Sequence, residues 1–319
     1  MSTPKLSVII PVFNNLATLP RILELLEKQN KTMFHEVVAV DNGSTDGTLA
    51  FLYEQQKIKP GYLNVLVEGK RGAGSARNTG AMTAKSPILL FLGGDILPAE
   101  NLLLRHYQVH LENPDPKIGC LGFVTWDRTL PPTPFMVYLE HGGPQNAFGE
   151  IAGKNFVDPR KYFYGSNISL KKKMFEDAGG FDTEHFSGYG WEDLELGIRL
   201  ADRGFKLFYE PQARGWHSHK VTLENVERRM MNVGMGYVML KKLHPNVEGL
   251  DLAIEHKKYW LRRLVFGGPI GLVVSFLASW CETRIVAKTL FRRAISLPFY
   301  IGVHQAMQKK GKSVDKVNS

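Results

Sequence analysis

The chain has 319 residues, a length that fits one large domain or two modest ones. Hydrophobic residues account for 44% and charged residues for 22%, which is ordinary for a globular protein and argues against a disordered or fibrous chain. The two cysteines, Cys120 and Cys281, lie far apart without metal-ligand spacing, so we expect a reducing compartment and no disulfide framework.

The net charge of +9 is unevenly distributed along the chain. Between Lys257 and Lys312 there are eleven Lys and Arg residues and one acidic residue, Glu282, so the remainder is close to neutral. This excess predicts that the C-terminal part meets an anionic partner, either a membrane surface or a polyanion. No nucleic-acid-binding motif accompanies it, and we expect no nucleic acid partner.

The first hundred residues alternate between short apolar runs and helical patterns. Strands are expected over Leu6–Val12, Glu36–Val40, Leu63–Val67 and Leu89–Leu92. A helix with Thr18 as a candidate N-cap follows the first strand, and further helices follow the next two. This alternation predicts an α/β fold with a parallel, doubly wound sheet.

Polar or glycine-rich segments follow these strands. The loop Asp41–Thr48 is dense in turn and capping residues, and Gly72–Gly80 opens a helix. Such a helix start is a good anion site, and Arg77 can grip a phosphate there, although a plain helix start is the alternative. Asp95 follows two glycines at the carboxyl end of its strand, the edge where ligands bind in open α/β sheets.

The order of these motifs resembles the nucleotide-binding half of family 2 glycosyltransferases, which have the GT-A fold and use nucleotide-activated sugars. The matching segments are Pro11–Asn15, Asp41–Asp46, Gly74–Asn78 and the strand into Asp95. The resemblance implies that Asp41 contacts the nucleobase. It places the other donor contacts at Pro11, Val12, Asn14, Gly74, Arg77, Gly94 and Asp95.

The metal motif of that family, D-x-D, is incomplete here. Its positions hold Gly93-Gly94-Asp95. One carboxylate provides too few ligands for a divalent ion, which prefers several. Two histidines, His217 and His219, lie two residues apart on an extended segment and therefore point the same way. We expect His219 or His217 to complete a Mn²⁺ or Mg²⁺ site with Asp95; ordinary hydrogen-bonded histidines are the alternative.

The motif Gly188–Leu196 carries the predicted chemistry. Trp191 offers a flat apolar face for a sugar, and Glu192 and Asp193 open a helix. Acidic residues in a first helical turn also occur for dipole reasons alone. The family resemblance implies that Asp193 is the general base, with Glu192 beside it. Asn167 resembles a family position that contacts a sugar, with a structural role as the alternative.

The middle of the chain is less regular. A helix is expected over Ala99–Glu112 and a strand over Ile118–Trp126. The stretch Asp127–Asp158 is rich in Pro, Gly and aromatic residues. We interpret it as an irregular acceptor-side or lid structure, and an ordinary surface excursion is an equal alternative. A strand over Lys206–Tyr209 is predicted to end in a turn at Pro211.

The C-terminal tail contains two apolar runs, Leu264–Cys281 and Ile295–Val303, each preceded by an Arg pair. Short apolar pieces with basic flanks are typical of helices lying in a membrane interface. We therefore expect peripheral attachment at the cytoplasmic face of the cell membrane, with a soluble helical tail as the alternative and a true span less favoured.

We predict a GT-A domain over residues 1–220, with a nucleotide half over 1–98 and an acceptor half over 99–220, and a basic helical region over 221–319. The expected activity is inverting transfer of a sugar from a UDP-sugar to a hydroxyl of a glycan or lipid-linked acceptor. A sugar-phosphate nucleotidyltransferase and a non-catalytic sugar-nucleotide-binding membrane protein remain as alternatives.

Overall fold

The computed structural model describes residues 4–30, 35–127, 129–141, 148–187, 190–247, 273, 277 and 288–314. The chain divides into two compact units, which are considered separately. The first, here called the α/β unit, comprises Met1–Leu130, Asn146–Gly188 and Glu192–His219. The second, the helical unit, comprises Pro131–Gln145, Tyr189–Trp191 and Lys220–Ser319.

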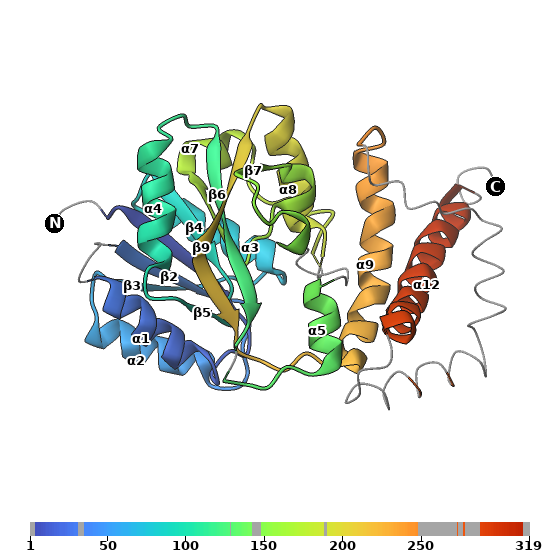
Figure 1. Cartoon of the computed structure of the whole chain (residues 1–319), viewed down its shortest axis with the longest axis horizontal. Coiled ribbons are helices and arrows are strands. Elements are labelled where there is room, and N and C mark those ends of the chain that lie inside the picture. Colours follow the sequence, from blue (N-terminus) through green and yellow to red (C-terminus); the bar gives the residue numbers. More distant parts are fainter. Residues whose placement is uncertain are drawn as a thin grey trace. The chain divides into compact units, whose positions relative to one another are not determined.

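The α/β unit is built on a twisted sheet flanked by helices (Figure 1). Its strands are β1 (Leu6–Val12), β2 (His35–Asp41), β3 (Leu63–Val67), β4 (Ile88–Leu92), β5 (Ile96–Pro98), β6 (Ile118–Trp126), β7 (Phe156–Val157), β8 (Asn167–Lys171) and β9 (Lys206–His217). They follow the order β3-β2-β1-β4-β8-β6-β9-β5, and β7 pairs with β9. The nucleotide half, β3-β2-β1-β4, is parallel throughout, as predicted. β8 joins it in the antiparallel direction, and β6 and β9 are again parallel.

The helices begin where the sequence offers caps or turns. Thr18 immediately precedes the first helix, and the Asp158 carboxylate accepts the Arg160 N–H at the start of another. The helices are α1 (Leu19–Asn30), α2 (Thr48–Ile58), α3 (Ala73–Thr83), α4 (Leu102–Glu112), α5 (Pro134–His141), α6 (Pro159–Tyr162), α7 (Lys172–Asp177), α8 (Glu192–Asp202), α9 (Leu223–Leu243) and α12 (Lys288–Val314).

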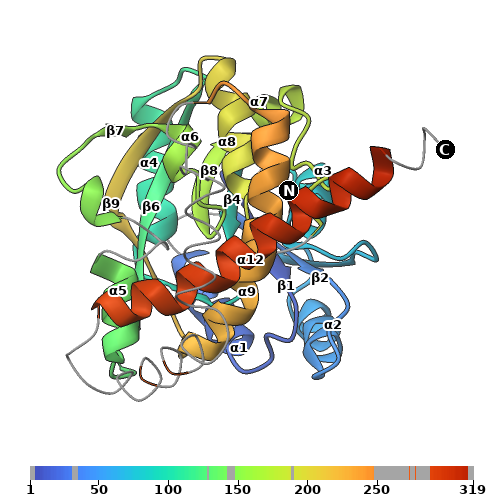
Figure 2. The ribbon, with the colours of Figure 1, turned by 90° about the vertical axis from the view of Figure 1, so that its right-hand side faces the viewer.

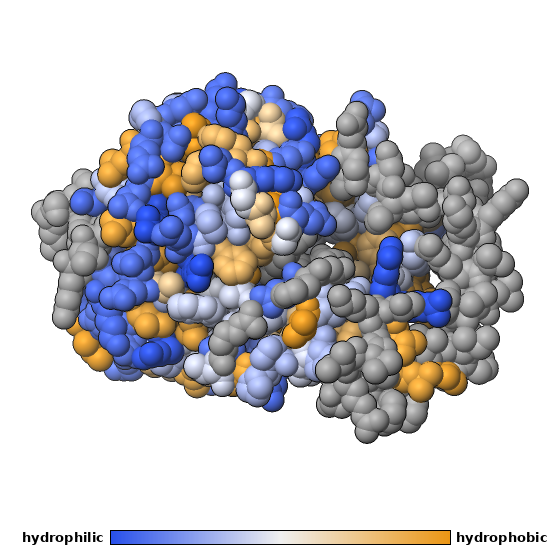
Figure 3. All heavy atoms as spheres, in the orientation of Figure 1, coloured by the Kyte–Doolittle hydropathy of each residue, from blue (hydrophilic) through white to orange (hydrophobic). Residues whose placement is uncertain are grey.

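The core of the α/β unit lies on both faces of the sheet. Every residue of β4 is buried, which explains why this strand reads as a continuous apolar run. Gly80 lets α3 approach the sheet closely, because a Cβ there would lie 2.5 Å from Ile9 Cγ2 and 3.2 Å from Val40 Cγ2. On the face shown in Figure 3, hydrophilic residues predominate over this part of the chain and apolar ones are scattered.

The strand β9 is longer than the sequence predicted. The predicted turn at Pro211 is wrong, because β9 continues to His217. Gly122 of β6 pairs with Glu210, whereas the next residue, Phe123, pairs with Arg214. The residues between Glu210 and Arg214 therefore bulge out, and the missing N–H of Pro211 costs no ladder hydrogen bond. The extension carries His217 to the end of β9.

The stretch Asp127–Asp158 is only partly irregular. Within the described residues it contains α5, a 3₁₀ turn at Phe148–Glu150 and β7, so it is more regular than its weak periodicity indicated. Pro134 occupies the first helical position, where its missing N–H is harmless. This helix has eight residues and is flanked by prolines and glycines, so its helical periodicity was not recognised in the sequence. The acceptor-side or lid role remains a prediction.

In the helical unit, α9 and α12 cross at close range (Figure 2). A Cβ on Gly234 of α9 would overlap the carbonyl oxygen of Phe299. A Cβ on Gly302 of α12 would overlap the carbonyl oxygen of Met231. Glycine at both positions therefore lets the two backbones touch, which explains two glycines in the middle of helices despite their low helix propensity.

The two apolar runs of the tail have different outcomes. Leu264–Cys281 lies almost entirely outside the described residues. Ile295–Val303 forms part of α12, and its side chains Ile295, Phe299 and Val303 are buried. Phe299 and Val303 belong to a core cluster with residues of α9, so one face of this run packs within the unit, and its attachment to a membrane remains a prediction. None of the helices described here is both long and apolar enough to cross a membrane.

Candidate active site

The turn after β1 is fastened to the loop after β2. The N–H of Asn14 donates to the Ser44 hydroxyl at 2.9 Å, and the Asn14 side-chain oxygen accepts the Thr45 N–H at 2.7 Å. Asn14 has a φ of 54°, a left-handed conformation that Asn tolerates better than most residues. Pro11 and Val12 form the carboxyl end of β1 and Asn14 follows them, at the edge where such sheets bind ligands.

Asp41 lies at the same edge, at the end of β2. Its Oδ2 accepts the backbone N–H groups of Gly43 at 3.0 Å and Ser44 at 3.1 Å. Its Oδ1 is buried and has no hydrogen-bond partner among the described residues. A buried carboxylate oxygen without a partner is costly, so this oxygen is positioned to accept a donor from a ligand.

Gly94 brings the Asp95 segment against the first turn. A Cβ on Gly94 would lie 2.9 Å from the Pro11 carbonyl oxygen and 2.8 Å from Asn15 Oδ1. The Thr18 hydroxyl also donates to the Gly94 carbonyl at 2.8 Å. Glycine is therefore required at position 94, and the predicted donor segments meet at one edge of the sheet.

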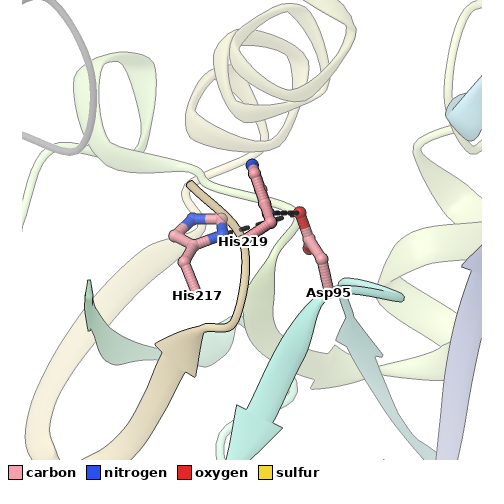
Figure 4. Close-up of side chains that lie close together, drawn as sticks. All are labelled: Asp95, His217 and His219. Carbon is pink, nitrogen blue, oxygen red and sulfur yellow. Dashed lines mark ion pairs between the residues drawn. The ribbon is translucent and has the colours of Figure 1, made fainter. Parts of the chain in front are cut away.

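Asp95, His217 and His219 form one cluster (Figure 4). Ile96 of β5 pairs with His217 of β9, and Ser218 donates to the Asp95 carbonyl through both its N–H and its hydroxyl at 3.1 Å. Asp95 Oδ2 lies 3.1 Å from His219 Nδ1 and 3.6 Å from His217 Nδ1. The sequence predicted these three residues as metal ligands, and β5, which it missed, is the element that joins them.

The chemistry of the cluster fits a divalent cation. One ligand atom from each of the three residues lies within 4.8 Å of the others. His217 Nδ1 is buried without a hydrogen-bond partner in the part of the chain that the structure describes, since 3.6 Å to Asp95 is too long for one. Burial raises the pKa of the Asp95 carboxyl, but the neighbouring imidazoles of His217 and His219 outweigh burial and hold that pKa well below its usual range. Asp95 is therefore ionised, as a ligand must be.

Asp193 and Glu192, in the first turn of α8, share one counter-ion. Arg77 Nη1 lies 3.0 Å from Asp193 Oδ1 and 3.6 Å from Glu192 Oε1. The second oxygen of Asp193, Oδ2, accepts the backbone N–H of Gly165 at 2.8 Å. The Asp193 side chain keeps 25% of its surface exposed, whereas the Arg77 and Glu192 side chains are nearly buried.

Arg77 reaches these carboxylates from α3. Its guanidinium lies over the ring of Phe181, with the Arg77 Cζ 5.3 Å from the ring centroid. Gly74, one turn earlier, also packs on Phe181, because a Cβ there would lie 3.2 Å from the Phe181 Cβ. Gly74 and Arg77 were predicted to contact the donor. The structure gives Gly74 a packing role and gives Arg77 two carboxylate neighbours.

A two-residue segment before β8 connects the two predicted halves of the site. The Ser166 carbonyl accepts the N–H of Gly93, two residues before Asp95. The N–H of the adjacent Gly165 donates to the Asp193 carboxylate. The Asp95 segment and Asp193 thus touch consecutive residues of one segment of the α/β unit.

The family described as glycosyl transferase family 2 matches residues 7–177, more than half of the chain. The chain belongs to glycosyltransferase family 2. A second family, described as the N-terminal domain of galactosyltransferase, matches residues 150–234 of this glycosyltransferase, a range that includes Asp193, His217 and His219.

Similar proteins agree with this assignment. The uncharacterized glycosyltransferase YfnE of Bacillus subtilis is 30% identical over 312 residues, which cover 83% of this chain and 74% of that protein. A validoxylamine A glucosyltransferase of Streptomyces hygroscopicus is 31% identical over 255 residues, which cover 72% of this chain but 59% of the longer relative.

Solved structures show the same GT-A fold. The mannosyltransferase PcManGT of Pyrobaculum calidifontis, in complex with GDP-Man and Mn²⁺, has a TM-score of 0.59 at 18% identity, and the match covers 97% of this chain and 89% of that one. GalNAc-T7 with UDP, GalNAc and Mn²⁺ has a TM-score of 0.55 at 17% identity, covering 94% of this chain and 56% of that one.

Asn167 is not available to a sugar in this glycosyltransferase. Its side chain is fully buried, its Oδ1 accepts the His106 Nε2–H at 2.9 Å, and its Nδ2 donates to the Ala213 carbonyl at 2.8 Å. The predicted sugar contact is therefore contradicted, and the structural alternative holds. Its amide ties α4 and the bulge of β9 to β8.

Trp191 is held by the helical unit. Its indole N–H donates to the Val233 carbonyl at 2.6 Å, and its ring centroid lies 5.8 Å from that of Tyr237. Trp191 has a φ of 76°, in the left-handed region that a bulky residue rarely adopts. Its proposed role as a platform for the acceptor sugar remains a prediction.

Sequence reasoning missed residues of the donor edge and of the Asp193 environment. Phe13 is 47% exposed, and the Arg71 guanidinium lies 4.8 Å from its ring centroid. The sequence could have indicated Phe13, because it is a large aromatic residue in an otherwise polar turn. Gly165 was missed because it contacts Asp193, a residue far away in the sequence, and only its position two residues before β8 hinted at it.

Proposed function

We propose that this enzyme transfers a sugar from UDP-sugar to a hydroxyl of a glycan or lipid-linked acceptor with inversion, using Asp193 as general base. The observation that carries the proposal is the Gly165–Ser166 segment, which contacts both the Asp95 loop and Asp193. It supports one site with a donor-binding edge and a proton acceptor in reach of each other.

The reaction is a single displacement. The acceptor hydroxyl gives its proton to the Asp193 carboxylate while its oxygen forms a bond to the anomeric carbon. The bond from that carbon to the diphosphate oxygen breaks, and its electron pair leaves with UDP. Attack comes from the face opposite the leaving group, so the anomeric configuration inverts. Asp193 suits this role because its side chain remains partly exposed on α8.

Asp95, His217 and His219 are proposed to hold a divalent cation. Mn²⁺ is favoured over Mg²⁺ because imidazole nitrogen is a poor ligand for Mg²⁺. A bound cation would neutralise charge on the donor diphosphate. The first aspartate of the D-x-D motif is absent, and the two histidines would replace it as metal ligands. The complexes of PcManGT and GalNAc-T7 that resemble this chain both contain Mn²⁺.

Uridine is the proposed nucleoside. Asp41 has one oxygen without a partner among the described residues, whereas its other oxygen is occupied by two backbone donors. Uracil presents one N–H donor on its pairing edge, which matches one free acceptor. Guanine presents two adjacent donors and would need both carboxylate oxygens. Relatives bind either base, since TarS of S. aureus is solved with UDP and PcManGT with GDP-Man.

The enzyme is proposed to act at the inner face of the cell membrane through its basic C-terminal region. Arg292 and Arg293 are exposed on α12, and exposed arginines suit contact with anionic lipid headgroups. Co-sedimentation with phosphatidylglycerol vesicles, but not phosphatidylcholine vesicles, is expected, and raising the salt concentration should release the protein. Equal recovery with both vesicle types would contradict the proposal.

A screen of nucleotide sugars with and without Mn²⁺ tests the reaction. UDP release is expected, whereas pyrophosphate release would identify a nucleotidyltransferase and binding without turnover a non-catalytic protein. Asp193→Asn should abolish release, while Asp202→Asn, the same change at the other end of α8, should not.

His219→Ala tests the metal site and should abolish Mn²⁺-dependent turnover. His185→Ala is the matched control, because His185 also pairs with an aspartate and its side chain is 41% exposed, against 39% for His219. Full activity of His219→Ala at saturating donor would exclude that residue as a ligand.

A further inference from the structure

The carboxylate of Asp193 is clamped from two sides. Arg77 Nη1 donates to Oδ1 at 3.0 Å, and the Gly165 N–H donates to Oδ2 at 2.8 Å. The two donors come from α3, which packs on β1 and β2, and from the segment before β8, which is hydrogen-bonded to Gly93. A carboxylate held at both oxygens has a fixed plane, and the direction in which its remaining lone pairs point is therefore also fixed.

Gly165 is the residue that makes room for this arrangement. A Cβ at position 165 would lie 2.5 Å from Asp193 Oδ1 and 2.9 Å from Arg77 Cζ. Real Cβ atoms do not approach so closely, so alanine at this position would push the ion pair apart. The φ of Gly165 is not in the left-handed region, and the close approach is what requires glycine here.

Nη1 of Arg77 is committed to carboxylates, whereas its buried Nε has no hydrogen-bond partner among the described residues. Its side chain is 8% exposed, it stands against Phe181, and its Nη1 faces both Asp193 and Glu192. If Arg77 turned to a diphosphate, two adjacent carboxylates would lose their shared counter-ion in a largely buried place, which is strongly unfavourable. The charge balance therefore favours Arg77 staying with the acidic pair.

We propose that Arg77 and Gly165 are positioning residues for the general base, and that Arg77 does not clamp the donor diphosphate. This inference rests on the proposed role of Asp193 and replaces the expected phosphate contact of Arg77. It assigns Arg77 to the chemical step and leaves the diphosphate to Asp95, the two histidines and the bound cation.

Binding of UDP and of uridine to Arg77→Lys and Arg77→Met separates the two roles. The ratio of the two dissociation constants reports only contacts to the phosphates. A positioning residue leaves this ratio within about threefold of the wild-type ratio, whereas turnover of UDP-sugar falls about 10- to 100-fold because the base is misplaced. Arg77→Lys should retain more turnover than Arg77→Met, because it keeps the charge.

Gly165→Ala tests the same idea without changing any charge. It should lower kcat about tenfold or more and leave the donor KM and UDP affinity unchanged. Gly149→Ala is the matched control, because no atom lies within 4 Å of a Cβ built at Gly149. Thermal unfolding of both variants separates misplacement of Asp193 from loss of folded protein.

A selective loss of UDP affinity in Arg77→Lys, with uridine affinity retained, would overturn the inference and restore the phosphate contact. Wild-type kcat in folded Gly165→Ala would overturn the role of Gly165. Neither result touches the proposed function, which fails instead if Asp193→Asn retains full turnover.

Discussion

Lowering the pH from 7 to 5 is expected to destabilise the α/β unit through two buried histidines of α4. His106 Nδ1 lies 2.9 Å from Ser169 Oγ, and His110 Nε2 lies 2.8 Å from the same hydroxyl. His106 also donates to Asn167, and both rings are essentially inaccessible to solvent. A proton added to either ring would place a positive charge in the buried contact between α4 and β8.

The magnitude follows from the shifted pKa values. Burial lowers the pKa of His106 to about 4, against the opposing effect of its hydrogen bond to Asn167. Burial, with the charges of Lys171 and His106, lowers the pKa of His110 to about 3. The unfolded chain binds protons at these sites below an ordinary pKa of about 6.5, whereas the native state does not. The free energy of unfolding is therefore unaffected by these sites above the ordinary histidine pKa. It decreases as the pH falls below that pKa, by about 2 kcal/mol for each histidine at pH 5.

Urea unfolding at pH 7 and pH 5 measures this loss. Wild type should lose roughly 4 kcal/mol from these two sites between the two pH values. His106→Gln should lose about 2 kcal/mol less than wild type over the same range, although it is less stable at pH 7. Comparing the two losses cancels the titration of every other group. An equal loss in wild type and in His106→Gln would refute the assignment of the pH dependence to this residue.

Three further results are expected. Gly234→Ala should destabilise the helical unit by about 1–3 kcal/mol, because the new methyl overlaps the Phe299 carbonyl; increased stability in urea would contradict the close crossing. Trp191→Phe loses the hydrogen bond to Val233 and should lower the free energy of unfolding by about 1 kcal/mol; an unchanged unfolding midpoint would count against that bond. Asn42→Asp removes two side-chain bonds to backbone carbonyls of the loop after β3 and should weaken UDP binding roughly tenfold by calorimetry; wild-type affinity would show that the loop does not need them.

The order of local patterns was enough to predict the architecture. Apolar runs separated by polar turns predicted β1 to β4 and the parallel nucleotide half, because strand and helix periods are local properties of the chain. The position of Asp95 after a buried strand and the two-residue spacing of His217 and His219 are also local features. That the three residues meet was expected from the family resemblance, and the pairing of β5 with β9 brings them together.

Side-chain partners were decided by the tertiary structure. Arg77 and Asp193 are 116 residues apart, and Asn167 and His106 are 61 apart, so no local pattern records that they meet. The sequence could assign Arg77 to phosphate and Asn167 to a sugar, because both residue types suit those ligands. Packing of α3 and α8 instead brings Arg77 to two carboxylates, and packing around β8 satisfies the amide of Asn167 with protein groups.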